Sequence, residues 1–209
     1  TFTAAALEAA KAQLVPEEVS YALQLPAPTQ VCFLGGRAAI RRALEGCGQS
    51  VEPILRDEFG APTLPSGVSA SVSHKREVAV ALVRPGSGIS VGVDIEQPAK
   101  RRRANLREKV LTLRERQGLG RLPGILEQEE VLLRFSLKEA LYKSIHPHVR
   151  RFVGFKEASV SPLADGTCEV ELLPDQQRGG GNPVWERMRV EAGWRSLPNG
   201  LGGPFFVTY

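Results

Sequence analysis

The chain has 209 residues, of which 42% are hydrophobic and 24% are charged, and its formal net charge at pH 7 is +4. This length and composition can bury a substantial core, in one large domain or two small ones. No run approaches the roughly 18 apolar residues that span a bilayer, and the Ala-rich start lacks the basic flank and continuous apolar centre of a secretion signal, so we expect no membrane association.

The three cysteines give a first indication of the compartment. Cys32, Cys47 and Cys168 are odd in number and show no CxxC spacing. This pattern argues against a disulfide framework or a zinc site and favours a reducing compartment, so we expect the cytoplasm. Because residue 1 is Thr, a removed leader or import into an organelle stays open.

The first half of the chain predicts helices followed by strands. We expect helices at 16–25 and 35–48, the second closed by glycines, and then a Pro- and Gly-rich loop at 59–67. Three short strands forming an antiparallel meander are expected at 68–74, 77–83 and 88–96.

The second half predicts the same order, helices followed by strands. Residues 98–146 are expected to be helical. The strands that follow are expected at 152–161, 167–174 and 205–209, with the Gly-rich segment 176–183 as a connection. Each half, 1–97 and 98–209, would then pack helices on an antiparallel sheet, which is the α+β class.

The segment 88–96, "GISVGVDIE", indicates a metal site. Apolar residues alternate along it, so Asp94 and Glu96 point to the same side. With Cα atoms about 6–7 Å apart, the two carboxylates repel by roughly 2–3 kcal/mol at an effective dielectric near 20. A cation relieves this repulsion, and a small set of carboxylate oxygens suits Mg²⁺. The alternative is that both are exposed polar residues on a strand edge.

A third carboxylate lies in the segment 134–144, "RFSLKEALYKS". At helical spacing Glu139 falls on a stripe with Phe135, Tyr142 and Lys143. A buried carboxylate requires a positive partner or keeps its proton. The alternative is an exposed pair of Glu139 with Lys143, which contributes only about 0.2–0.5 kcal/mol.

Several other side chains could bind phosphate. Arg37 lies on a predicted helix, Arg56 precedes the loop 59–67, and Ser73 and His74 end the first predicted strand. Each one taken alone is more typical of a solvated or structural residue. The glycines at 35–36 match neither phosphate-loop spacing.

Positive charge is concentrated between Lys100 and Arg121, a segment that contains nine Lys or Arg residues and only two Glu residues. We expect this segment to attract an acidic partner, and the alternative is a solvated helix with a basic face.

Two of these motifs together resemble a known family. "VGVDIE", followed 45 residues after Asp94 by the Glu of "FSLKEALYK", is similar to the signature pair of the 4′-phosphopantetheinyl transferases of the holo-acyl-carrier-protein synthase superfamily. "GRAAIRRAL", "FGAPTLPSG" and "SVSH" match the upstream motifs in order and spacing, so the resemblance runs from about residue 16 to residue 160. It is closest to the Sfp/EntD type, a monomer whose single chain forms two similar α+β halves in a pseudo-dimeric fold.

The resemblance implies the site residues. Asp94, Glu96 and Glu139 would hold Mg²⁺ against the pyrophosphate of coenzyme A, and Lys143 would face the pyrophosphate. The residues implied to bind the 3′-phosphoadenosine end are Arg37, Arg56, Ser73 and His74. Residues 1–97 would thus bind the nucleotide and supply the first metal ligands, and residues 98–209 would carry the catalytic helix and the carrier-docking surface.

The implied reaction is attack by a serine hydroxyl of an acyl or peptidyl carrier protein on the β-phosphate of coenzyme A, which releases 3′,5′-ADP. Glu139 or a metal-bound water would take the serine proton. Carrier proteins are acidic around this serine, so Lys100–Arg121 becomes the expected docking surface. One departure is Ala61, where many members have Lys, so one phosphate contact is expected to be missing.

Two other functions compete with this interpretation. A metal-dependent nuclease could use the same acidic residues, but the basic segment lacks interleaved aromatics, so we expect no nucleic-acid partner. A non-catalytic module that only binds carrier proteins would not depend on Glu139.

Overall fold

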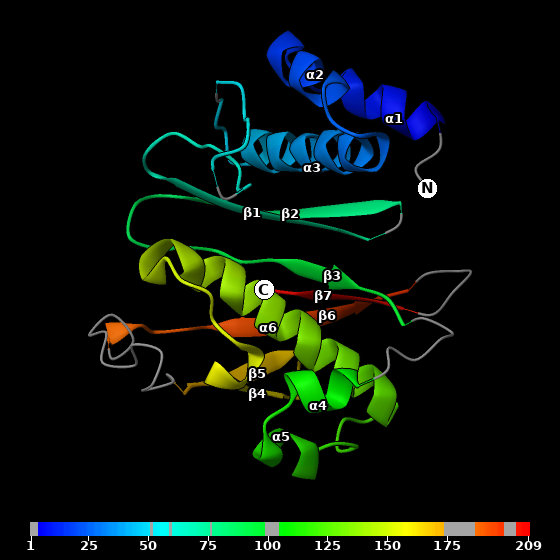
Figure 1. Cartoon of the computed structure of the whole chain (residues 1–209), viewed down its shortest axis with the longest axis vertical. Coiled ribbons are helices and arrows are strands. Elements are labelled where there is room, and N and C mark those ends of the chain that lie inside the picture. The colour runs from blue at the N-terminus through cyan, green and yellow to red at the C-terminus, as the bar shows by residue number, and fades with distance from the viewer. Residues whose placement is uncertain are drawn as a thin grey trace. The chain divides into compact units, whose positions relative to one another are not determined.

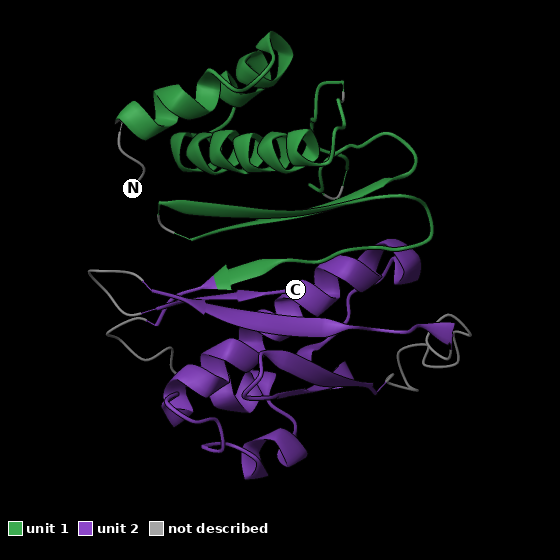
Figure 2. Cartoon of the chain, turned by 180° about the vertical axis from the view of Figure 1, so that it is seen from behind, with its two compact units in different colours: residues 1–95 green, residues 96–209 purple. Residues whose placement is uncertain are grey.

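The computed structural model describes residues 4–50, 52–58, 60–75, 77–98, 105–173, 187–198 and 204–209. The chain divides into two compact units, Thr1–Ile95 and Glu96–Tyr209, which Figure 2 colours separately. Both units combine helices with antiparallel strands, so the predicted α+β class is confirmed.

The described residues of the first unit form three helices and a β-hairpin (Figure 1). Its elements are α1 (Ala4–Lys11), α2 (Pro16–Leu23), α3 (Ala27–Gly46), β1 (Val68–Lys75) and β2 (Val78–Pro85). Helix α1 was not predicted. Helix α3 begins eight residues earlier than expected, because Pro26 at the N-cap and Pro28 in the first turn suit a helix start. Strands β1 and β2 pair in antiparallel register from Val68 opposite Pro85 to Lys75 opposite Val78.

Helix α3 packs on the hairpin through small and branched side chains. Ile40 and Leu44 of α3 are fully buried and contact the apolar face of β1. Gly36 allows the closest approach, since a Cβ at this position would lie 3.3 Å from Cγ2 of Val72. One face of β1 is therefore covered by α3, and the serines that alternate with its apolar residues face the other way.

The predicted meander is wrong in its third strand. Residues 89–93 form no strand, and β3 is confined to Asp94–Glu96. The backbone amides of this segment instead donate hydrogen bonds to serine side chains of β1. Ser69 Oγ accepts from the Val91 amide at 3.1 Å, and Ser71 Oγ accepts from the Val93 amide at 3.0 Å.

In the part of the second unit that the structure describes, there are three helices, a 3₁₀ turn and four further strands. Its elements are α4 (Leu106–Val110), α5 (Leu113–Gln117), α6 (Glu127–Val149), η1 (Phe155–Glu157), β4 (Ala158–Pro162), β5 (Thr167–Leu172), β6 (Ala192–Leu197) and β7 (Phe205–Thr208). Where the structure describes the expected helical segment 98–146, it forms three separate helices. The expected strand 152–161 contains the 3₁₀ turn η1, and its strand, β4, begins only at Ala158. Strand β6 was not predicted.

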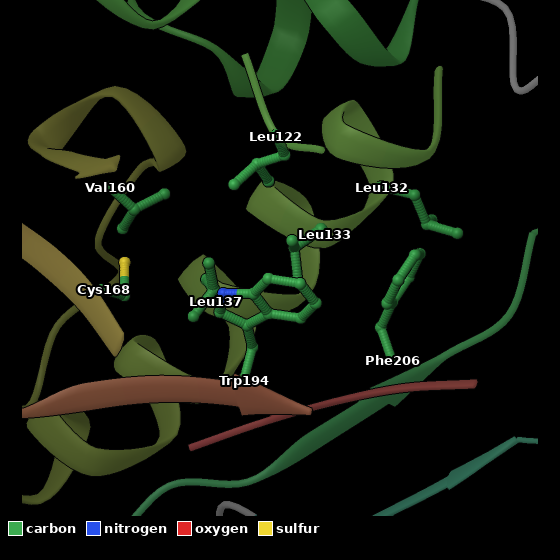
Figure 3. Packing of buried hydrophobic residues seen from close by; sticks show 8 residues of the cluster. All are labelled: Leu122, Leu132, Leu133, Leu137, Val160, Cys168, Trp194 and Phe206. Atoms are coloured by element: carbon green, nitrogen blue, oxygen red, sulfur yellow. The ribbon is translucent and has the colours of Figure 1, made fainter. Parts of the chain in front are cut away.

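Helix α6 covers one face of the strands of the second unit, which lie in the order β7-β6-β5-β4. Leu133 and Leu137 of α6 enter a core with Trp194 of β6 and Phe206 of β7 (Figure 3). Three glutamates in the first turn stabilise the helix start, and Arg150, with φ of 47°, ends the helix in the left-handed region.

Two further observations bear on the sequence predictions. Among the described residues, no helix is both long and apolar enough to cross a membrane. The connection 176–183 and the basic residues 100–103 lie outside the part of the chain that the structure describes.

Candidate active site

Asp94 is held at the start of β3 by a serine of β1. Ser73 Oγ donates a hydrogen bond of 2.7 Å to Asp94 Oδ1, and both residues are buried. This bond continues the series that Ser69 and Ser71 make to the preceding backbone. The alternation of serine along β1 therefore fixes both the path of residues 91–94 and the orientation of the Asp94 carboxylate.

The predicted carboxylate pair is buried rather than exposed. Asp94 is 6% exposed and Glu96 is 7% exposed, with the core residue Ile95 between them. Strand geometry places both carboxylates on the same side, opposite Ile95. The alternative of polar residues on an exposed edge is therefore wrong.

This pair fits a hard divalent cation in its chemistry, because carboxylate oxygens are the ligands that Mg²⁺ prefers. Within the described residues, no three Asp, Glu, His or Cys side chains converge on a common metal position. The predicted set of Asp94, Glu96 and Glu139 draws on both units, and as a set it stays a prediction.

Two arginines of the first unit share one aromatic ring. The guanidinium carbon of Arg37 lies 4.5 Å from the centroid of Phe33, and that of Arg56 lies 5.6 Å from it. Burial, and then the like charge of Arg56, lower the pKa of Arg37 to about 10. An anion such as a phosphate would offset the repulsion between these two like charges.

Arg37 also has a structural role that the sequence did not reveal. It is only 3% exposed, and its Nε and Nη2 donate to the carbonyl oxygens of Ile54 and Leu55 at 2.6 and 2.8 Å. The segment that carries Arg56 is thereby attached to α3.

A buried ion pair between α2 and α3 supports the same segment. The Glu18 carboxylate, which is inaccessible to solvent, accepts two hydrogen bonds from Arg41, at 2.8 and 2.9 Å. It also accepts from the Ile54 amide at 2.7 Å. Arg41 shares a helix face with Arg37, but its guanidinium group is bonded to Glu18. Nothing in the sequence predicts the pairing of Arg41 with Glu18.

Helix α6 presents Glu139 and Lys143 one turn apart, and both are half-buried. The prediction that Glu139 lies on the apolar face is only partly right, since Leu133, Leu137 and Leu141 fill the core. Glu139 lies on the flank of that face, where the helix borders a cavity.

The cavity beside Glu139 has a volume of about 90 Å³ and lies wholly within the second unit. Its walls are mainly apolar and come from α6 and from the chain between Phe152 and Ala158. Glu139, Lys138 and Tyr142 provide its polar groups. Phe152, which is 67% exposed, stands beside Tyr142 with the two ring centroids 6.4 Å apart.

The charges that α6 buries most deeply were not predicted as site residues. Lys138 is 3% exposed and pairs with Glu115 of α5 at 2.7 Å, and Arg134 is 5% exposed and pairs with Glu130 at 2.6 Å. Burial lowers the pKa of Lys138, and Glu115 opposes this effect. The i,i+4 spacing of Glu130 and Arg134 is the one signal by which the sequence could have revealed either pair.

His74 and two described arginines of the basic segment, Arg107 and Arg114, lie at the surface. His74 is exposed at the end of β1. In the described part of the basic segment, Arg107 pairs with Glu127 and Arg114 pairs with Glu171 within the same unit. These pairs reduce the free positive charge that the sequence predicts there.

Comparison with known proteins assigns both units to related groups. Residues 90–181 match the 4′-phosphopantetheinyl transferase superfamily, and residues 28–84 match the 4′-phosphopantetheinyl transferase N-terminal domain. The chain is 33% identical over 162 residues to 4′-phosphopantetheinyl transferase Npt of Nocardia iowensis, covering 73% of this chain and 72% of that protein. It is 30% identical over 155 residues to 4′-phosphopantetheinyl transferase PptT of Mycobacterium tuberculosis, covering 73% of this chain and 67% of that protein.

Proposed function

Because this chain belongs to the 4′-phosphopantetheinyl transferase superfamily, we propose that it transfers 4′-phosphopantetheine from coenzyme A to a serine of an acyl or peptidyl carrier protein and releases 3′,5′-ADP. The observation that carries the proposal is the buried pair of Asp94 and Glu96 within the matched segment. Family membership argues against a nuclease and against a module that only binds carriers.

Asp94, Glu96 and Glu139 are the proposed ligands of Mg²⁺. When bound, this ion would neutralise the pyrophosphate charge. Ser73 would hold the Asp94 carboxylate in the orientation that ligation requires, as its 2.7 Å hydrogen bond indicates. A direct contact of Ser73 with coenzyme A stays a prediction from the resemblance.

The basic side chains would bind the phosphates. Arg37 and Arg56, which both lie against the Phe33 ring, would bind the 3′-phosphate of the nucleotide. His74 would extend this contact from the exposed end of β1, and Lys143 would face the pyrophosphate as a point charge from α6. In such a reaction most of the acceleration comes from orientation and charge neutralisation.

The cavity beside Glu139 would receive the pantetheine chain of coenzyme A. This chain is uncharged and slender, and the cavity offers apolar walls with a few polar groups at one side. Enlarging Ala158 to Leu should fill the cavity and raise the KM for coenzyme A. The same substitution should leave the affinity for 3′,5′-ADP unchanged, because this nucleotide lacks the chain.

The carrier protein would dock on the basic segment of the second unit. Arg114 of α5 is 80% exposed at its side chain, and Leu113 beside it is 73% exposed. A mixed basic and apolar surface suits an acidic helical partner, and its association should weaken as salt increases. We further propose a monomer that works in the cytoplasm, where its three free thiols would stay reduced.

The proposal is tested by intact-mass spectrometry of an apo carrier protein incubated with this protein, coenzyme A and Mg²⁺. The carrier should gain the mass of one phosphopantetheine, and EDTA should prevent the gain. If several acyl and peptidyl carriers stay unmodified while the protein is folded, the proposed function is wrong.

A further inference from the structure

The ammonium group of Lys138 is fully occupied inside the second unit. Its Nζ donates to the Val110 carbonyl at 2.9 Å, to Glu115 Oε2 at 2.7 Å and to the Phe155 carbonyl at 2.8 Å. A lysine ammonium has three protons, so these contacts use all of them. They connect α6 to the end of α4, to α5 and to η1.

The Glu115 carboxylate is equally well used. Its Oε2 also accepts from the Thr112 amide at 2.6 Å, which caps the start of α5. Its Oε1 accepts from the Val160 amide of β4 at 2.9 Å. With Glu115 only 2% exposed, the Lys138–Glu115 pair forms one bonded unit that spans from α6 to β4.

This pair holds both walls of the cavity beside Glu139. Lys138 precedes Glu139 on one wall, and its partner Phe155 belongs to the opposite wall. Val160, bonded to Glu115, lies two residues after Ala158, another lining residue. The separation of α6 from the chain between Phe152 and Ala158 is therefore set by the two charged side chains.

The attraction between the two charges does not by itself account for such a pair, because removing both charges from water offsets that attraction. A fixed network of charged hydrogen bonds instead defines a single arrangement of the elements it joins.

We propose that Lys138 and Glu115 are positioning residues, which set the orientation of Glu139 and the width of the cavity beside it. This role rests on the transferase function proposed above. Neither residue is assigned a contact with the phosphates or with the metal. A displacement of about 1 Å at a reacting group lowers turnover by up to about 100-fold, so their loss should act mainly on kcat.

The matched control is the second buried ion pair of the same helix. Arg134 donates to Glu130 and to the Val160 carbonyl, and Glu130 accepts from the Gly120 amide at 2.7 Å. This pair is as deeply buried and also contacts β4, but neither residue lines the cavity. Arg134→Met should therefore reduce stability without changing the chemistry.

The experiment compares Lys138→Met, Glu115→Gln and Arg134→Met with the wild-type protein. For each, urea titration gives the folded fraction, and mass spectrometry of the carrier gives kcat and the KM for the carrier. We expect Lys138→Met and Glu115→Gln to lower kcat per folded molecule by about 10- to 100-fold, with the KM for the carrier unchanged. Arg134→Met should keep the wild-type kcat per folded molecule.

Three results would overturn the inference. Wild-type kcat in folded Lys138→Met or Glu115→Gln would show that the pair does not position the site. An equal loss of kcat in Arg134→Met would show a general effect of core damage. If neither pair variant folds, the pair is needed for the fold itself. Absence of transfer by the wild-type protein would instead reject the proposed function, and this inference with it.

Discussion

Replacing Glu18 with Ala should destabilise the first unit and lower its affinity for a nucleotide. The substitution removes a carboxylate with no solvent exposure and leaves Arg41 without its partner. Breaking a buried pair in this way costs about 3–5 kcal/mol. Because the Arg41 side chain keeps 13% exposure and can reach water, we expect the lower part of that range, about 3–4 kcal/mol.

The structure predicts where this loss appears. The Ile54 amide loses its acceptor, which alone accounts for about 1–3 kcal/mol of the change. Arg56 lies two residues further on, so its position over Phe33 should loosen as well. We therefore expect weaker binding of 3′,5′-ADP in addition to lower stability.

Urea titration and calorimetry test both effects. With an m value near 2 kcal/mol/M, a loss of about 3–4 kcal/mol lowers the urea midpoint by about 1.5–2 M. Glu17→Ala, on the same helix but exposed, is the control and should change stability by no more than about 0.5 kcal/mol. If Glu18→Ala unfolds at the same urea concentration as Glu17→Ala, the energetic argument for the buried pair fails.

Three further predictions address the site and the fold. Glu139→Gln should lower the rate of transfer by about 100-fold, which is the usual cost of losing one electrostatic contact to a transition state. Its urea midpoint should stay at the wild-type value. Carrier modification and urea titration measure the two effects. Gly166→Ala should lower the free energy of unfolding by about 1–3 kcal/mol, because φ is +89° and the new Cβ would lie 2.8 Å from the Trp194 carbonyl oxygen. Equal melting temperatures of the variant and the wild-type protein would contradict this prediction. Burial raises the pKa of the Cys168 thiol to about 12, so a thiol reagent at about pH 8 should label exposed Cys47 quickly and Cys168 only after unfolding.

The elements with a clear hydrophobic period were predictable from the sequence. Strands β1 and β2 begin and end within two residues of their predicted positions, because apolar residues alternate with serines in β1 and β2 is a short apolar run bounded by turn residues. The third strand of the expected meander does not form at residues 89–93, for a reason that the hydrophobic period cannot reveal. Its amides bond serine side chains of β1, and such a bond depends on which segments the fold brings together.

The candidate site was predictable to the same extent. The common direction of Asp94 and Glu96 follows from alternation along the chain, whereas their burial depends on the packing around them. The pairing of Lys138 with Glu115, 23 residues apart, was not predictable, since a charged residue is normally expected at the surface.

The buried carboxylates of this protein share a feature that explains why charge is used there. Glu18, Glu115 and Glu130 each accept a hydrogen bond from a backbone amide as well as from a cationic side chain. A buried amide without an acceptor is costly, and no apolar side chain can supply one. The usual argument that an apolar pair could replace a buried ion pair at no loss therefore does not hold for these three, because the replacement would also leave the amides without acceptors. The carboxylates act as acceptors for parts of the backbone that neither a helix nor a strand satisfies, and the segments fixed in this way include those that carry Arg56 and border Glu139.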